Sequence, residues 1–98
     1  MKAYISGGIT GVDNYMDNFI TAENHLQNEY EVINPAKILF NMPSSTTYSQ
    51  YMTLCIALID QSDVVCMLPE WEESKGASFE HHYAEISRKK IIYMEVQE

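Results

Sequence analysis

The sequence predicts an α/β domain built on a four-stranded parallel sheet with helices on both faces. Strand-like and helix-like segments alternate along the whole chain, an order typical of parallel sheets with right-handed crossovers. Residues 64–68 are continuously apolar, which favours a central strand covered on both faces, although a short buried helix has the same pattern. With 98 residues, the chain has room for a single domain, residues 1–98.

The N-terminal segment predicts a strand, a turn and a helix. Residues 2–6 form the strand and run into a glycine-rich segment, residues 7–11, which indicates a tight strand-to-helix turn. Asp13 and Asn14 can cap a helix whose apolar residues recur along one face. We expect this helix to end near Asn28.

A short strand and a second helix come next. Residues 30–33 form the strand, which stops at Asn34-Pro35 because proline cannot donate to a strand ladder. We expect a loop over residues 36–47, whose serines and threonines at 44–47 are N-cap candidates for the next helix. That helix carries a broad apolar stripe, which includes Tyr51 and Met52 and is expected to pack on the sheet, and it closes at residues 60–63.

The last third completes a βαβαβαβ order, which predicts a flavodoxin- or Rossmann-like three-layer domain. Pro69 ends the central strand, a loop over 70–74 leads to a helix over 75–88, and residues 91–94 form the last strand. Ligands of such sheets bind beyond the carboxyl ends of the strands. Three loops are therefore expected to converge there: residues 6–14, 34–37 and 69–76.

The net charge and the cysteines indicate which kind of partner and which compartment the protein has. Six Lys and Arg residues against 14 Asp and Glu residues give a net charge of -8, and Arg88 is the only arginine. Binding to nucleic acid is therefore disfavoured, and a small-molecule ligand is favoured. Cys55 and Cys66 have apolar neighbours, as buried reduced thiols do, which favours the cytoplasm. No apolar run approaches the roughly 18 residues of a membrane span, and we expect neither a span nor a signal peptide.

Two standard phosphate-binding motifs, G-x-G-x-x-G and G-x-x-x-x-G-K-[ST], are absent from the sequence. An enzyme that uses a nicotinamide cofactor or ATP is therefore disfavoured, and no cofactor is expected. The segment Ser6-Gly7-Gly8-Ile9-Thr10-Gly11 can bring backbone close to a ligand, with the hydroxyls of Ser6 and Thr10 as donors. A purely structural turn explains this segment equally well.

Glu80 is the main candidate for chemistry. On a helix it shares a stripe with small residues, namely Gly76, Ala77, Ala84 and Ser87. A carboxylate with so little bulk around it, on a face that should meet the sheet, is expected to face a ligand. Ser74 and the free N–H groups of the first turn would form an anion site. The alternative is a slightly rotated helix on which Glu80 points to solvent.

The loop before this helix contains Trp71 and three carboxylates, Glu70, Glu72 and Glu73. Trp71 could stack on a flat base while an acid contacts ring nitrogens, although a solvent-facing loop with one anchoring aromatic is the commoner arrangement. His81 and His82 diverge by about 100° on a helix, so no metal site is expected.

Several of these segments together resemble the nucleoside 2-deoxyribosyltransferase-like superfamily, most closely its small phage and bacterial members. The similarity covers nearly the whole chain, and its most specific part is the Ser-x-Gly-x-x-x-Glu element ending at Glu80. The other segments are residues 4–11, Asn34-Pro35, Ser62-Asp63-Val64-Val65 and residues 71–80.

The resemblance implies that Glu80 attacks the anomeric carbon of a 2-deoxyribosyl group and that Tyr4 orients it. In the related 2′-deoxynucleoside 5′-monophosphate N-hydrolases, the glycine loop and a serine bind the 5′-phosphate, which implies this role for residues 6–11 and Ser74. Candidate substrate-binding residues are therefore Ser6, Gly7, Gly8, Ile9, Thr10, Gly11, Asn34, Trp71, Ser74 and Gly76. The resemblance also implies a homodimer or higher homo-oligomer, in which a neighbouring subunit completes the pocket.

Three functions remain open on the sequence. The first is cleavage or exchange of the N-glycosidic bond of a deoxynucleoside or its 5′-monophosphate. The second is a nucleotide-binding protein of the same fold that sequesters or senses its ligand without turnover. The third is a subunit of a larger complex. The preferred base, the 5′-phosphate and the acceptor are not determined by these residues.

Overall fold

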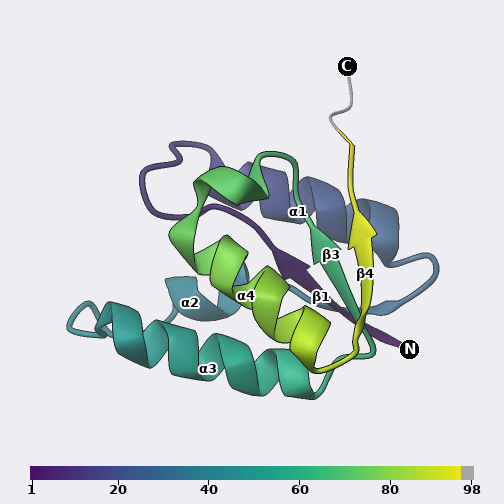
Figure 1. Ribbon diagram of the computed structural model, residues 1–98. Helices are drawn as coiled ribbons and strands as arrows, with labels where there is room; N and C mark the ends of the chain where they lie inside the picture. The colour runs from purple at the N-terminus through teal and green to yellow at the C-terminus, as the bar shows by residue number, and fades with distance from the viewer. Residues whose placement is uncertain (96–98) are drawn as a thin grey trace.

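Four parallel strands form the centre of the computed structural model, which describes residues 1–95 (Figure 1). The sheet has the order β2-β1-β3-β4 and contains β1 (Lys2–Ser6), β2 (Glu31–Ile33), β3 (Val64–Met67) and β4 (Lys90–Tyr93). All four residues of β3 are buried. The predicted α/β class and the buried central strand are therefore confirmed.

Helices cover both faces of the sheet, as predicted. α1 (Tyr15–Leu26) packs against one face, and α3 (Tyr48–Asp60) and α4 (Lys75–Ile86) cover the other (Figure 1). Because successive residues of a strand point to opposite faces, β1 turns Ala3 and Ile5 towards α1 and Tyr4 towards α3 and α4.

The stretch expected as a loop after β2 contains a short helix, α2 (Pro35–Phe40). The side chain of Asn34 accepts a hydrogen bond from the N–H of Ala36 at 3.0 Å, and Pro35 occupies the first helical turn. An Asn-Pro pair thus begins a helix as well as ending a strand, because proline's fixed φ suits the first helical position. The expectation of a continuous loop was wrong for this reason.

The end of α4 also differs slightly from the prediction. The helix stops at Ile86 rather than at residue 88. Arg88 adopts a left-handed φ of 59°, and the N–H of Lys89 returns to the carbonyl of Ala84 at 3.0 Å. This is the hydrogen-bond pattern with which many helices terminate.

The strand order puts a crevice at the carboxyl edge of the sheet. From β1 the chain crosses to β2 on one side, and it returns to β3 on the other. The loops that follow β1 and β3 therefore leave the sheet at the point where the strand order reverses, which is where ligands of such sheets bind. Leu68, just after β3, lies so close to Gly7 that a Cβ at Gly7 would be 2.9 Å from the Cβ of Leu68, which a change of rotamer does not move. A larger residue at Gly7 would therefore force the backbone to shift.

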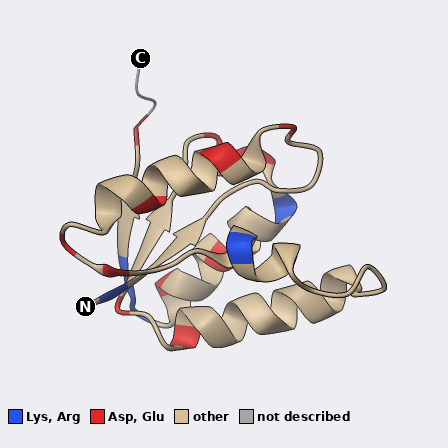
Figure 2. Cartoon of the chain, turned by 180° about the vertical axis from the view of Figure 1, so that it is seen from behind, with Lys and Arg blue, Asp and Glu red and all other residues tan. Residues whose placement is uncertain are grey.

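Acidic and basic residues are distributed differently over the molecule. In Figure 2 the Asp and Glu positions are spread over several helices and loops, whereas the Lys and Arg positions are few, and three of them, Arg88, Lys89 and Lys90, are consecutive. Within residues 1–95, no helix is long and apolar enough to cross a membrane.

The first turn of α3 provides a test of the local structure. Thr47 caps this helix, with the N–H of Gln50 donating to its hydroxyl and the side chain of Gln50 accepting from its N–H. We expect Thr47→Ala to lower the free energy of unfolding by about 0.5–2 kcal/mol in urea titrations. Thr53→Ala, on the same helix and without a capping role, is the control, and an equal loss in both variants would contradict the assignment.

Candidate active site

Glu80 lies inside the protein, between α4 and β1. Its side chain is only 5% exposed, so the alternative of a rotated helix that turns it to solvent is excluded. The hydroxyl of Tyr4 donates to Oε2 at 2.9 Å, and the hydroxyl of Ser6 donates to Oε1 at 2.6 Å. Each carboxylate oxygen therefore has its own donor, and both donors come from the same strand.

Small residues on α4 allow this close approach. Ala77 and Ala84, one turn before and after Glu80, are 1% and 0% exposed, so the stripe predicted to meet the sheet does so. The helix starts at Ser74, whose hydroxyl accepts the N–H of Ala77 at 3.2 Å. The Ser74 cap and the small-residue face together place the carboxylate over β1.

Burial governs the ionisation of this cluster. Loss of solvation raises the pKa of Glu80 above its ordinary value, and hydrogen bonds from Ser6, Tyr4 and Cys55 oppose that rise. Burial and the neighbouring carboxylate raise the pKa of Tyr4 well above 10, so its hydroxyl remains a donor. Burial also raises the pKa of Cys55 to about 12, which keeps it a thiol. Neutral hydroxyl and thiol dipoles thus surround the carboxylate.

A cavity of about 490 Å³ opens next to Glu80. Its walls come from β1 and the loop after it, from α1, α2 and α3, and from the first turns of α4. Glu80, Tyr4 and Cys55 line it, together with Gly7, Ile9, Thr10, Tyr48, Tyr51, Met52, Glu73, Ser74, Lys75 and Gly76. This volume is within the range of about 300–1,000 Å³ typical of small-molecule sites.

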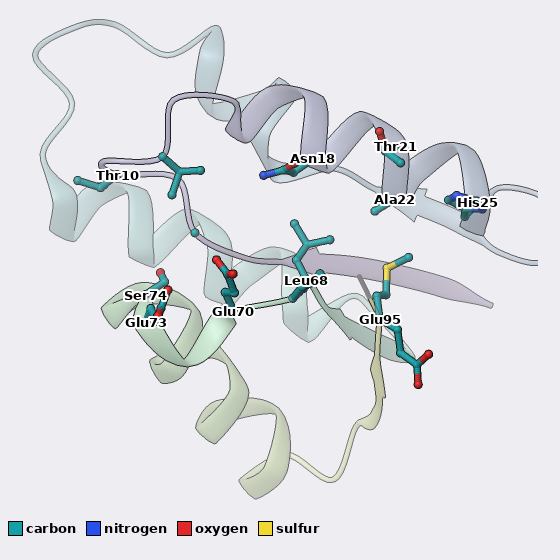
Figure 3. A pocket seen from close by; sticks show the side chains of 14 residues that line it. Thr10, Asn18, Thr21, Ala22, His25, Leu68, Glu70, Glu73, Ser74 and Glu95 are labelled. Atoms are coloured by element: carbon teal, nitrogen blue, oxygen red, sulfur yellow. The ribbon is translucent and has the colours of Figure 1, made fainter. Parts of the chain in front are cut away.

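A second cavity of about 410 Å³ lies beside α1 (Figure 3). In Figure 3 the side chains of Leu68 and Glu70 point into the space below α1, while that of Glu95 points away from it. The two cavities share Thr10, Glu73 and Ser74 as lining residues. The loops after β1 and β3 therefore form a common wall at the carboxyl edge. Pro35, from the third segment that was predicted to converge there, lines the Glu80 cavity.

Most of the candidate ligand-binding residues lie at these cavities. Gly7, Ile9 and Gly76 line the Glu80 cavity, Gly8 lines the second cavity, and Thr10 and Ser74 line both. Gly11 has a left-handed φ of 77° and lines neither cavity.

Three other candidates have structural contacts instead. The Ser6 hydroxyl donates to Glu80. Asn34 caps α2 and donates to Glu23 at 3.0 Å, and it lies outside both cavities within residues 1–95. Trp71 also lies outside them, because its ring stacks on His81 with centroids 4.1 Å apart. The predicted contacts of Asn34 and Trp71 with a ligand have no support in this geometry.

The three loop glutamates differ in whether they line a cavity, a difference that the sequence did not reveal. Glu73 lines both cavities, Glu70 lines only the second, and Glu72 lines neither. Glu70 adopts a left-handed φ of 64° before a short 3-10 helix, η1 (Trp71–Glu73).

The aromatic wall of the Glu80 cavity was not predicted from the sequence. Tyr48, Tyr51 and Met52 come from the first turns of α3, and the periodicity of Tyr51 and Met52 was interpreted as packing on the sheet. Lys75 and Cys55 were missed as lining residues as well. Two tyrosines and a methionine at the exposed start of a helix were the signal that could have identified this wall.

The histidines show no sign of a metal site. His81 accepts or donates a hydrogen bond with the hydroxyl of Tyr93 at 2.7 Å and lies 3.4 Å from Glu85. Among the residues that the structure describes, no group of three or more His, Cys, Asp or Glu side chains could hold a metal ion.

A Rossmann-like α/β domain with a buried carboxylate beside a cavity at the carboxyl edge of its sheet is the class that these observations define. The chain belongs to the family described as Domain of unknown function (DUF4406), whose model matches residues 1–93. No curated protein and no solved structure matches the chain.

The raised pKa of Glu80 predicts how stability depends on pH. At a pH below the unfolded-state pKa, Glu80 is protonated in both states, so its burial has no ionic cost. As pH rises through the raised folded-state pKa, the buried group ionises and the free energy of unfolding falls.

Glu80→Gln removes this dependence while keeping the shape of the side chain. We expect its stability advantage over the wild type, measured by urea unfolding, to be larger at about pH 8 than at about pH 4. Glu85→Gln, an exposed change on the same helix, is the control. An advantage that is constant or grows towards acid pH would contradict the pKa assignment.

Proposed function

We propose that this protein cleaves the N-glycosidic bond of a 2′-deoxynucleoside or its 5′-monophosphate through a glycosyl intermediate on Glu80. The observation that carries the proposal is a buried carboxylate, 5% exposed, that has a hydroxyl donor on each oxygen and lines a cavity at the carboxyl edge of the sheet. A buried charge is costly unless it is paired, so this arrangement favours a functional role. The resemblance to deoxyribosyltransferase-like proteins supports the same residue as nucleophile.

The proposed reaction has two displacements. In the first, a lone pair of a Glu80 oxygen forms a bond to C1′ while the C1′–N bond breaks. The electron pair of the C1′–N bond leaves with the base, and the base takes up a proton from water. In the second, a water molecule attacks C1′ and loses a proton, and the bonding pair returns to Glu80. Two displacements retain the configuration at C1′. A second base in place of water would give base exchange.

The surroundings of Glu80 suit the charge that develops in this reaction. Glycosyl transfer passes through an oxocarbenium-like transition state, and a carboxylate held by neutral donors stabilises positive charge in a region of low dielectric. Tyr4 remains protonated, because its pKa is well above 10, and it keeps its hydrogen bond to Oε2. The unused lone pairs of the carboxylate are those that attack.

Other residues that line the Glu80 cavity suit the phosphate and the base of a nucleotide. Ser74, Lys75 and Gly76 form the start of α4 at the cavity wall, and the N–H groups of a helix N-terminus bind phosphate. The rings of Tyr48 and Tyr51 offer flat apolar surface to a base. The homo-oligomer that the resemblance implies stays a prediction.

Release of free base tests the activity directly. Purified protein is incubated with each common deoxynucleoside and its 5′-monophosphate, and free base is measured by chromatography. We expect release from at least one of them and a loss of at least about 10³-fold in Glu80→Gln, with Glu85→Gln unchanged. Release that is undiminished in Glu80→Gln would contradict the mechanism.

The alternative, a nucleotide-binding protein without turnover, is decided by the same samples. In calorimetry it predicts tight binding of a nucleotide that is recovered unaltered. Cleavage of the bound nucleotide would contradict this alternative, and tight binding with no release of base would contradict the enzymatic proposal.

Glu73 provides a second test, because it is the loop carboxylate at the Glu80 cavity. We expect it to accept hydrogen bonds from the N–H groups of the base, so that Glu73→Ala lowers kcat/KM by about 10-fold or more, the effect of losing a hydrogen bond to a charged group. Glu72→Ala, a change in the neighbouring residue that lines neither cavity, is the matched control. Equal effects in the two variants would show that Glu73 has no special role.

A further inference from the structure

Ser6 has a contact that the proposed reaction does not yet use. Its hydroxyl, on a side chain that is 1% exposed, donates to Oε1 of Glu80 at 2.6 Å. A serine hydroxyl has one proton to donate. While that proton is given to Glu80, it cannot also be given to a phosphate, which was the role expected for Ser6 from the sequence.

The backbone of Ser6 is held by the sheet. Ser6 is paired with Met67 of β3, and its carbonyl accepts the N–H of Leu68 at 2.8 Å. Tyr4, two residues earlier on the same strand, therefore points to the same face. Groups on rigid strands hold a site more precisely than groups on loops, so the spacing between the two donor hydroxyls is fixed by β1.

We propose that Ser6 is a positioning residue for Glu80, fixing Oε1 while Tyr4 fixes Oε2, so that the carboxylate faces the cavity in one orientation. This inference rests on the proposed function, since it assigns Ser6 a part in presenting the nucleophile. With one donor, a single hydrogen bond would oppose rotation about the last side-chain bond of Glu80. With a donor on each oxygen, that rotation breaks two buried hydrogen bonds.

The same contact favours the ionised nucleophile. A hydroxyl that donates to a carboxylate stabilises its charged form, and Ser6 is the largest of the influences that lower the pKa of Glu80 against the effect of burial. The groups that face Glu80 are Tyr4 and Ser6 from β1 and Cys55 from α3. The cavity also has Lys75 from α4 and the titratable lining residues Tyr15, Tyr48, Tyr51 and Glu73.

Ser6→Ala removes the donor and leaves the strand intact. The matched control is Ser62→Ala, because Ser62 is also a buried serine, 2% exposed, but its hydroxyl donates to the carbonyl of Leu58 at 2.9 Å. Each variant loses one buried hydroxyl, but only the hydroxyl of Ser6 contacts Glu80. Thermal unfolding of each checks that a difference in activity does not come from loss of folded protein.

The first measurement does not depend on turnover. Protein labelled with ¹³C at glutamate carboxyl groups is titrated by NMR, and the Glu80 signal is assigned by its absence from Glu80→Gln. We expect the pKa of Glu80 to be higher in Ser6→Ala than in the wild type and unchanged in Ser62→Ala. An unchanged pKa in Ser6→Ala would overturn the proposal.

The second measurement is the pH profile of the hydrolysis reaction. We expect Ser6→Ala to lower kcat by about 10-fold or more, with KM changed little, and to shift the acidic limb of kcat/KM to higher pH. A loss confined to KM would overturn the positioning role and restore the phosphate-binding role. A shifted pKa of Glu80 with no turnover in the wild type would contradict the enzymatic function while leaving the control of Glu80 by Ser6 established.

Discussion

The contact between Glu80 and β1 constrains the rest of this structure. A carboxylate that is only 5% exposed would be strongly destabilising without donors on its oxygens, and the hydroxyls of Tyr4 and Ser6 supply them. Reaching those hydroxyls requires α4 to lie close to the sheet, which the alanines one turn before and after Glu80 permit. The chain thus accepts an ionisable group in its core, and the raised pKa of that group is the consequence.

The position of the contact in the fold explains its surroundings. β1 and β3 are the central strands of the sheet, and their loops leave it where the strand order reverses. Gly7 lets the loop after β1 pass against Leu68, and Ser74 starts α4 from the loop after β3. These two loops form the wall that both cavities share. The start of α3, where the capping box at Thr47 fixes the first turn, adds apolar surface to the Glu80 cavity, as do α1 and α2.

Local patterns in the sequence predicted most of the fold and part of the candidate site. The apolar run over 64–68 and the alternation of segments predicted the sheet, and the small residues around Glu80 predicted the helix face that meets it. The short helix α2 was missed because Asn34-Pro35 both ends a strand and begins a helix. Periodicity also could not show that Tyr51 and Met52 face a cavity rather than packed side chains. The partners of Ser6 and Trp71 depend on tertiary contacts: Glu80 lies 74 residues away from Ser6, and Trp71 reaches His81 through the left-handed turn at Glu70.

The central claim is that Glu80 forms a covalent bond to the sugar, and mass spectrometry of a quenched reaction tests it most directly. Protein mixed with a turned-over deoxynucleoside or deoxynucleotide is denatured in acid within the first turnover, its intact mass is measured and its peptides are mapped. We expect a fraction of the protein to be heavier by one deoxyribosyl group, with or without its 5′-phosphate, with the addition on Glu80 and none in Glu80→Gln. Base release with no adduct on any residue, or an adduct on a residue other than Glu80, would contradict it.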